Sequence, residues 1–191
     1  MDRRTRLLPL ALLLAPAAMA APDHYTADPT HTFVSFEAPH IQAISIWRGK
    51  FDRTKSGAFS LDLAAKTGTV DVVVDTSSVD FGLQKLNEHV SSKDFLDVAT
   101  YPTAEYKGNI KFEGDTPASV EGQLTLHGVT KPLTLKINTF KCIQHPMLKK
   151  QVCGADAAGE INRSDYGVDM GVNFTGSGSV KLAIQVEALK D

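Results

Sequence analysis

Histidine is the side chain in this sequence best suited to acid–base or metal chemistry near neutral pH. His31 and His40 lie nine residues apart beside the first long predicted strand, so they form no local pair of metal ligands. His89 and His145 each lack a second ligand four residues further along. The sequence has no G-x-S-x-G nucleophile motif and no glycine-rich phosphate loop. We therefore predict no catalytic residues, no metal site and no cofactor, and we interpret the histidines as loop or rim residues.

The two cysteines, Cys142 and Cys153, are the other residues with a chemistry of their own. Ten residues separate them, a spacing that matches neither a C-x-x-C redox motif nor a zinc knuckle. An even number of cysteines in an exported chain favours one structural disulfide, which leaves no thiol free to act as a nucleophile. The ring that this bond closes is short, so its expected stabilisation is at most about 3 kcal/mol.

The first twenty residues have the composition of a secretory signal peptide. Three arginines precede the apolar run Leu7–Ala17, which is too short to span a bilayer as a helix. Ala18–Ala20 form a small-x-small cleavage signature, so the mature chain should begin near Ala21. A membrane anchor is the competing interpretation, but two prolines interrupt the run. We expect export to the periplasm and one domain over 21–191, because no linker, repeat or composition shift divides these residues.

Net charge limits the partners of the mature chain. Removal of residues 1–20 takes away three arginines and one aspartate and changes the formal net charge from −2 to −4. A mildly acidic chain with scattered lysines presents no basic surface for nucleic acid, and none for an anionic membrane. An outer-membrane barrel is a further alternative, because it also consists of antiparallel strands. The many charges within the predicted strands argue against it, so we do not expect an integral membrane protein.

Alternation of apolar and polar residues with a period of two is the main structural signal of the mature chain. In Thr69–Asp75, the valines at even positions share one face and the aspartates share the other. Short strands at near-regular spacing predict an antiparallel sandwich or barrel, and Gly49–Thr54 with Gly57–Leu63 is predicted to form a hairpin. The remaining predicted strands are Thr32–Glu37, Thr103–Phe112, Ser119–Leu126, Leu133–Cys142, the weaker Ala155–Asn162, and Ser179–Ala188.

One segment, Phe81–Asp97, departs from the strand pattern. Leu83, Leu86 and Val90 recur in it at helical spacing, with polar residues between them. Pro102 then ends the segment, because the residue before a proline avoids helical backbone angles. An amphipathic helix inserted among strands commonly covers a barrel mouth or a sheet edge.

Large apolar residues are the remaining candidates for function. Trp47 lies in the apolar stretch 41–48, and most of the phenylalanines fall in or beside the predicted strands and the helix. These side chains can fill a solid core or line a cavity for a ligand, because eight-stranded barrels do both. Composition and spacing leave the two alternatives open.

Five blocks of the mature chain, in order, resemble the YceI-like family of periplasmic proteins. The strongest match is Gly122–Pro132, and each block is short. Five of them in the right order are specific, and together they extend over nearly all of the mature chain. The other blocks are Tyr25–Phe36 followed by His40, Gly49–Phe51, His89–Asp97 with Tyr101 and Pro102, and the late loop Asn162–Gly167.

Resemblance to this family implies an extended lipocalin-like fold: an all-β, antiparallel eight-stranded barrel with one short inserted helical segment. It also implies a long, curved apolar tunnel that binds a polyisoprenoid, without cofactor chemistry by the protein itself. The family often has Arg-Asp just before the helical His-Leu, whereas Leu86 and Asn87 stand here, so the head-group preference is open. On this basis the predicted ligand-binding residues are Phe36, Trp47, Phe51, Phe95, Phe112 and His31.

The main functional hypothesis is binding, transport or storage of a long-chain isoprenoid lipid, either a quinone or a polyprenyl phosphate. The alternative is an enzyme or stress-response factor that acts on a lipid or quinone at the barrel rim, with His31 or His40 as the base. No paired acid–base signature supports the enzyme. The sequence leaves open the length of the lipid, its loading partner and the oligomeric state, including a homodimer.

Overall fold

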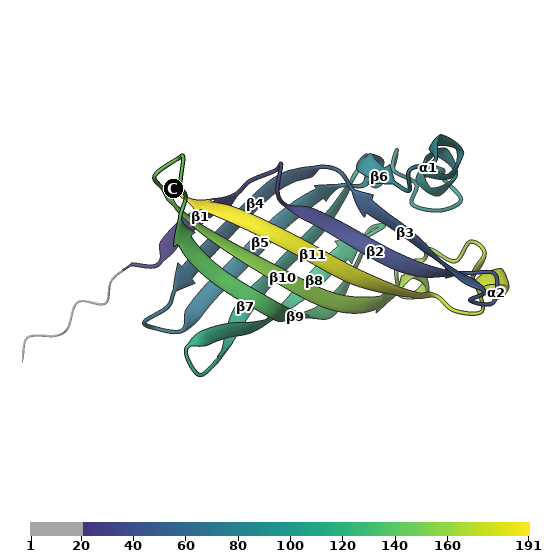
Figure 1. Cartoon of the computed structure of the whole chain (residues 1–191). Helices are drawn as coiled ribbons and strands as arrows, with labels where there is room; N and C mark the ends of the chain where they lie inside the picture. The colour runs from purple at the N-terminus through teal and green to yellow at the C-terminus, as the bar shows by residue number, and fades with distance from the viewer. Residues whose placement is uncertain (1–20) are drawn as a thin grey trace, which may run out of the picture.

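A computed structural model of the chain describes residues 21–191, and the predicted signal peptide lies outside the described residues. Figure 1 shows these residues as an elongated barrel of antiparallel strands, with the helices α1 (Gln84–Ser91) and α2 (Val172–Thr175) at one end and the C-terminus at the other. The predicted all-β, eight-stranded antiparallel barrel is confirmed.

The first two of the eight lines of strand in the barrel wall are interrupted. β1 (Asp23–Ala27) and β2 (Phe33–His40) follow one another along the same edge of β11 (Ser179–Lys190). β3 (Ser45–Phe51) pairs with β2, and β4 (Thr54–Asp62) pairs with β1, so these two also follow one another. The barrel closes where β1 pairs with β11. The other strands are β5 (Thr67–Asp75), β6 (Val79–Asp80), β7 (Thr103–Glu113), β8 (Thr116–Leu126), β9 (Val129–Gln144) and β10 (Gln151–Asn162).

The predicted hairpin between Gly49–Thr54 and Gly57–Leu63 is wrong. β4 is hydrogen-bonded to β1 and β5, whereas β3 is hydrogen-bonded to β2 and β6. The connection at Asp52 and Arg53 does not reverse the chain, because the backbone N–H groups of both residues donate to Ser78 instead of bonding across a turn. A period of two determines the face on which a side chain lies, but not the strand beside it.

Two buried threonines stabilise the backbone where the two strand lines are interrupted. The Thr32 hydroxyl donates to the Glu187 carbonyl on β11 and accepts from the Glu187 N–H. The Thr54 hydroxyl donates in turn to the Thr32 carbonyl. These hydroxyls replace the ladder hydrogen bonds that interrupted strands lose, so the backbone polar groups inside the wall keep their partners.

The predicted helical segment is confirmed as α1, followed by hydrogen-bonded turns that end near Tyr101. Val90 on α1 is buried against Phe36, Val79, Leu96 and Val168. The second helix, α2, has only four residues and shows no helical period in the sequence. Gly171 and Gly176 flank it, both at positive φ, and glycine adopts this conformation without the steric cost of a Cβ atom.

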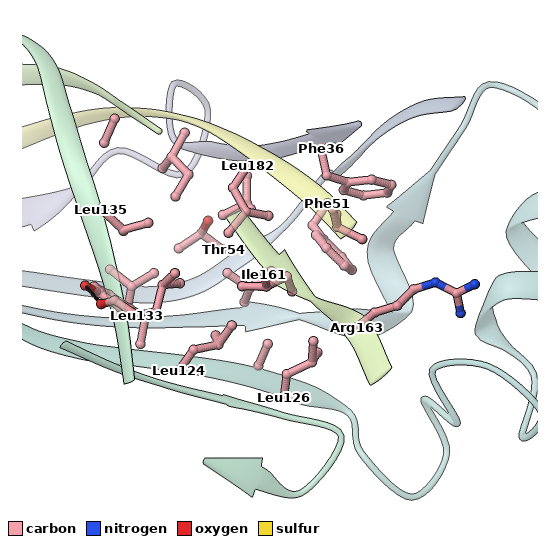
Figure 2. A pocket seen from close by; sticks show the side chains of 18 of the residues that line it. Phe36, Phe51, Thr54, Leu124, Leu126, Leu133, Leu135, Ile161, Arg163 and Leu182 are labelled. Atoms are coloured by element: carbon pink, nitrogen blue, oxygen red, sulfur yellow. Dashed lines mark hydrogen bonds between the residues drawn. The ribbon is translucent and has the colours of Figure 1, made fainter. Parts of the chain in front are cut away.

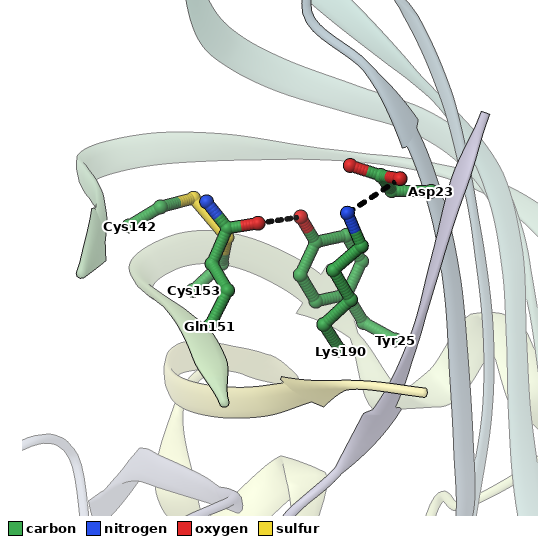
Figure 3. The surroundings of a disulfide bond; sticks show 6 residues. All are labelled: Asp23, Tyr25, Cys142, Gln151, Cys153 and Lys190. Carbon is green, nitrogen blue, oxygen red and sulfur yellow. Dashed lines mark hydrogen bonds and ion pairs between the residues drawn. A yellow bond between two sulfur atoms is a disulfide. The ribbon is translucent and has the colours of Figure 1, made fainter. Parts of the chain in front are cut away.

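A disulfide bond joins Cys142 on β9 to Cys153 on β10, as the sequence predicts. The two residues are direct partners in the ladder between these strands. Figure 3 shows the bond beside Tyr25, whose hydroxyl donates to Gln151 Oε1 at 2.9 Å. The bond lies near the end of the barrel opposite the helices, where the C-terminal strand β11 pairs with β10.

Removal of the disulfide should lower stability modestly and leave the barrel folded. Replacing both cysteines by serine should cost at most about 3 kcal/mol, because the closed ring is short. For a domain of this size that corresponds to a fall of roughly 10 °C or less in the thermal midpoint. Circular dichroism during heating measures the shift. Loss of the β-sheet signal at room temperature in the double variant would show that the bond is needed for folding.

Candidate functional site

A cavity of about 610 Å³ extends along the inside of the barrel. Its wall consists of the inward-facing strand positions, because side chains alternate between the two faces of a sheet. On β5, Val70, Val72 and Val74 line the cavity, whereas Asp71 points outward and pairs with Lys107 at 3.1 Å. Figure 2 shows apolar side chains from several strands converging on this space. The structure therefore decides in favour of a cavity over a solid core.

Apolar side chains form the inner end of the cavity, opposite the helices. Tyr25, Leu61, Cys153 and Ala188 are buried there and also line the cavity wall. Burial raises the pKa of the Tyr25 hydroxyl, which therefore stays neutral and donates its hydrogen bond. Phe112 packs against this cluster but does not line the cavity. The disulfide thus supports the wall at the inner end.

A buried tyrosine contributes to the middle of the cavity wall. The Tyr106 hydroxyl lies 3.0 Å from the carbonyl oxygens of both Val120 and Leu133. Burial raises the pKa of Tyr106 to about 12, so the hydroxyl is neutral and acts as a donor. Its ring passes close to Gly122, where a Cβ atom would come within 2.6 Å of it. The Tyr106 hydroxyl is therefore hydrogen-bonded within the barrel wall, and the apolar surface of its ring faces the cavity.

A row of aromatic rings leads from the cavity to its mouth. Phe51 and Phe81 both contact Phe36, with ring centroids 5.5 and 5.3 Å away. The Trp47 ring lies 6.1 Å from Phe81 and 5.1 Å from the imidazole of His40. Most of these contacts are edge-to-face, a geometry that stabilises aromatic pairs. The row connects β2 and β3 to the segment that enters α1, and all five rings line the cavity.

A buried positive charge lies at the mouth, at the end of β10 (Figure 2). Arg163 begins the turn η2 (Arg163–Tyr166), is only 8% exposed and lines the cavity. Its Nη1 atom donates to the Val168 carbonyl at 2.7 Å, and its Cζ atom lies 4.9 Å from the centre of the Phe95 ring. Burial lowers the pKa of Arg163, an effect that the charge of Asp169 partly offsets. An arginine side chain nevertheless remains protonated at neutral pH.

The Arg163 guanidinium has N–H donors without a protein acceptor among residues 21–191. Arginine carries five N–H donors, and within residues 21–191 the Val168 carbonyl is the protein acceptor of one of them. Every fully buried polar side-chain atom in the same residues has a partner, so the remaining donors of Arg163 reach accessible space. His40, His89 and Thr175 also line the mouth. This arrangement can bind an anionic or carbonyl oxygen at the open end of an apolar cavity.

Four of the six predicted ligand-binding residues lie on the cavity wall: Phe36, Trp47, Phe51 and Phe95. Phe112 packs against the buried cluster at the inner end but does not line the cavity.

His31, the sixth predicted residue, lies outside the lining of the cavity, in the interruption between β1 and β2. Its side chain is exposed, and its Nδ1 atom is 2.8 Å from Asp28 Oδ2. Hydrogen bonds from Thr30 and His31 lower the pKa of Asp28 to about 2, and the carboxylate raises the pKa of His31. This pair fixes the loop between the two strands and explains why His31 is not directed inward.

Residue-level reasoning from the sequence missed the polar part of the mouth. Asn162 to Ser164 match a glycosylation sequon, and nothing in the local pattern singles out Arg163. The signal that could have found it is the late-loop block Asn162–Gly167, whose arginine follows a strand directly. Met170 and Phe174 line the mouth as well, in a segment without a strand or helix period.

The described residues contain no free cysteine, since Cys142 and Cys153 are bonded to each other. In the same part of the chain, His, Cys, Asp and Glu side chains nowhere gather in threes that could hold a metal ion. Across residues 21–191, no helix combines the length and the apolar character needed to cross a membrane.

The closed wall and the apolar interior define a class of protein: an antiparallel β-barrel with an internal cavity suited to an elongated apolar molecule. Residues 25–188 match the model of the YceI-like domain. The chain belongs to the YceI-like family, which confirms the resemblance seen in the sequence blocks.

Relatives in bacteria match over most of their length. A UPF0312 protein of Pseudomonas savastanoi pv. phaseolicola is 36% identical over 160 residues, which cover 83% of this chain and 82% of that protein. A UPF0312 protein of Pseudomonas putida is 35% identical over 182 residues, which cover 94% of this chain and 92% of the relative.

Solved structures share the fold. BcnA of Burkholderia cenocepacia has a TM-score of 0.62 and 24% identity, and the match covers 85% of this chain and 98% of that one. A polyisoprenoid binding domain from Saccharophagus degradans has a TM-score of 0.61 and 19% identity, with coverage of 87% and 98%. The YCEI protein of Campylobacter jejuni has a TM-score of 0.64 and 26% identity, with coverage of 78% and 87%.

Proposed function

We propose that this chain binds a long-chain isoprenoid lipid inside the barrel and carries or stores it in the periplasm. The observation that carries the proposal is the apolar cavity, which extends from Tyr25 at the inner end to Phe174 at the mouth. Its volume of about 610 Å³ lies in the range of small-molecule sites. The Saccharophagus structure with the same fold, described as a polyisoprenoid binding domain, supports this ligand class.

Burial of an apolar tail supplies enough free energy for such a function. About ten buried CH₂ groups contribute roughly 8 kcal/mol at ~0.8 kcal/mol each. Association and chain ordering remove several kcal/mol of that gain. A longer tail buries more CH₂ groups and restores the lost binding free energy. A dissociation constant near micromolar corresponds to about −8 kcal/mol. The aliphatic wall therefore suffices for binding without a strong polar contact.

The buried guanidinium at the mouth favours an anionic head group within the isoprenoid class. Arg163 stays charged and has donors left over, and phosphate oxygens accept paired hydrogen bonds from arginine. A quinone carbonyl is a neutral acceptor, so its hydrogen bond to the guanidinium lacks the ion-pair attraction that a phosphate adds. A polyprenyl phosphate therefore fits the mouth better than a quinone does.

Extraction of the purified protein tests the ligand class. Protein recovered from the periplasm should have an intact mass that lacks residues 1–20, and its organic extract should contain an isoprenoid lipid by mass spectrometry. Delipidated protein should rebind a polyprenyl phosphate, with a change in Trp47 fluorescence, because Trp47 lines the mouth.

A matched pair of variants on β2 connects that binding to the cavity. Phe36→Gln places a polar amide on the wall and should weaken binding about tenfold or more. Phe33→Gln is the control, because Phe33 lies outside the cavity lining with the Lys50 ammonium 4.6 Å from its ring. If delipidated protein binds no isoprenoid or fatty chain at high micromolar concentration, the proposed function is wrong.

A further inference from the structure

The open end of the barrel carries an exposed apolar surface that lipid binding inside the barrel does not require. Ile44 is 78% exposed and Phe174 is 76% exposed, and Ile41 and Met170 beside them are also exposed. We call these four residues the mouth patch. Apolar residues gathered on an exposed surface commonly mark an interaction site. Ile41, Met170 and Phe174 also line the cavity, so the patch and the cavity entrance are continuous.

Two segments far apart in the sequence build the mouth patch. The turn between β2 and β3 carries Ile41 and Ile44, and α2 carries Phe174. The Gln42 N–H donates to the Phe174 carbonyl at 2.9 Å, which holds the turn against α2. Figure 1 shows α2 beside the tip of β2 and β3, at the end of the barrel that carries α1. The patch is therefore a defined surface of the fold.

The backbone of the turn is held in an unfavourable conformation. Ile41, Gln42 and Ala43 have φ angles of +31°, +48° and +62°. L-amino acids, and β-branched ones above all, avoid this region, which glycine or asparagine would occupy at lower cost. Strained backbone tends to occur at functional positions. Ile41 occupies a position where the backbone geometry favours glycine. This indicates that its apolar side chain has a functional role.

The mouth patch lies on two stretches of sequence that lack charged side chains. Residues 38–47 and 170–180 contain no Asp, Glu, Lys or Arg. At the opposite end of the barrel, Met147 and Leu148 are also exposed, but Lys149 and Lys150 follow them directly. An apolar, uncharged surface can enter the boundary between head groups and acyl chains of a bilayer without desolvating a charge.

We propose that the mouth patch docks the barrel onto the surface of a lipid bilayer, with Ile44 and Phe174 inserted at the boundary. The inference rests on the proposed function, because a bound isoprenoid must pass between membrane and cavity. Docking at the patch places the entrance against the bilayer, so the apolar tail need not cross water. Since the patch carries no charge, docking does not depend on anionic lipids and persists at high salt.

Vesicle flotation with delipidated protein tests the docking. The vesicles consist of zwitterionic phosphatidylcholine without isoprenoid, so the result is independent of cavity occupancy. The variant Ile44→Ser/Phe174→Ser should reduce the partition coefficient at least about tenfold, because it removes two inserting side chains. The control Met147→Ser/Leu148→Ser should stay within about twofold of the unmodified protein, and roughly 0.5 M salt should leave binding unchanged. All four residues are exposed, and thermal unfolding verifies that the variants are folded.

Several outcomes would overturn the docking: no binding of the unmodified protein, equal loss in both variants, or binding that needs anionic lipid and disappears in salt. A dimer in analytical ultracentrifugation that only the patch variant dissociates would assign the patch to self-association and reject the membrane. Isoprenoid affinity is measured separately by Trp47 fluorescence, with Ile44→Ser as the patch variant outside the cavity lining. Loss of isoprenoid binding with normal flotation rejects the proposed function alone.

Discussion

Ala157→Phe should reduce the affinity for a long isoprenoid tail by about a hundredfold or more. Ala157 lies on β10, opposite Ile184 on β11 and Ile137 on β9, and its side chain lines the middle of the cavity. A phenyl ring there occupies the space of the tail and prevents burial of the part beyond it. Four excluded CH₂ groups at ~0.8 kcal/mol each correspond to roughly 3 kcal/mol, which is more than a hundredfold in affinity.

Tail length distinguishes this blockage from a general defect. A short farnesyl phosphate should still bind Ala157→Phe with nearly unchanged affinity, because the cavity between Ala157 and the mouth stays open. Equilibrium titration with Trp47 fluorescence compares the short and the long ligand. Ala158→Phe is the matched control on the same strand, since Ala158 lies outside the lining and the ring should point away from the cavity. Equal losses for both variants would contradict a tail bound in this cavity.

Arg163→Gln should weaken binding of a polyprenyl phosphate between about tenfold and a hundredfold and change quinone binding little. Hydrogen bonds to charged groups contribute about 1.5–3 kcal/mol, and the variant removes the charge at the mouth. A quinone of equal tail length relies on the same apolar wall but forms no ion pair, so its affinity should stay within about threefold. Binding titrations with both ligands measure the ratio of the two affinities.

A structural role of Arg163 must be separated from recognition, because its side chain also bonds to the Val168 carbonyl and stacks on Phe95. Arg163→Lys keeps the positive charge but lacks the planar guanidinium that donates paired hydrogen bonds, so it should recover part of the affinity for the phosphate ligand. Arg48→Gln removes an exposed, ion-paired arginine on β3, directly after the cavity-lining Trp47, and should leave the affinity for both ligands unaffected. If Arg163→Gln weakens quinone and phosphate equally, the residue supports the loop and the head group is bound elsewhere.

Sequence alone was sufficient wherever the relevant geometry is local. The side-chain direction along a strand has a period of two, so the alternation in Thr69–Asp75 correctly separated the cavity-facing valines from the outward Asp71. The helical spacing of Leu86 and Val90 identified the segment that covers the barrel end. The pairing of Cys142 with Cys153 needed no structure either, because a chain with two cysteines offers each of them a single intramolecular partner.

Only the tertiary structure decided which strands are neighbours and what meets at the mouth. β1 pairs with β11, more than 150 residues away, and this closure makes a cavity out of faces that could equally have formed a solid core. The same closure brings Arg163 onto the ring of Phe95 and leaves His31 outside. A pattern of apolar and polar residues specifies the face of each strand but not its partner, its register or the space left between facing side chains. Those depend on contacts between distant segments, and they determine the candidate ligand site of this protein.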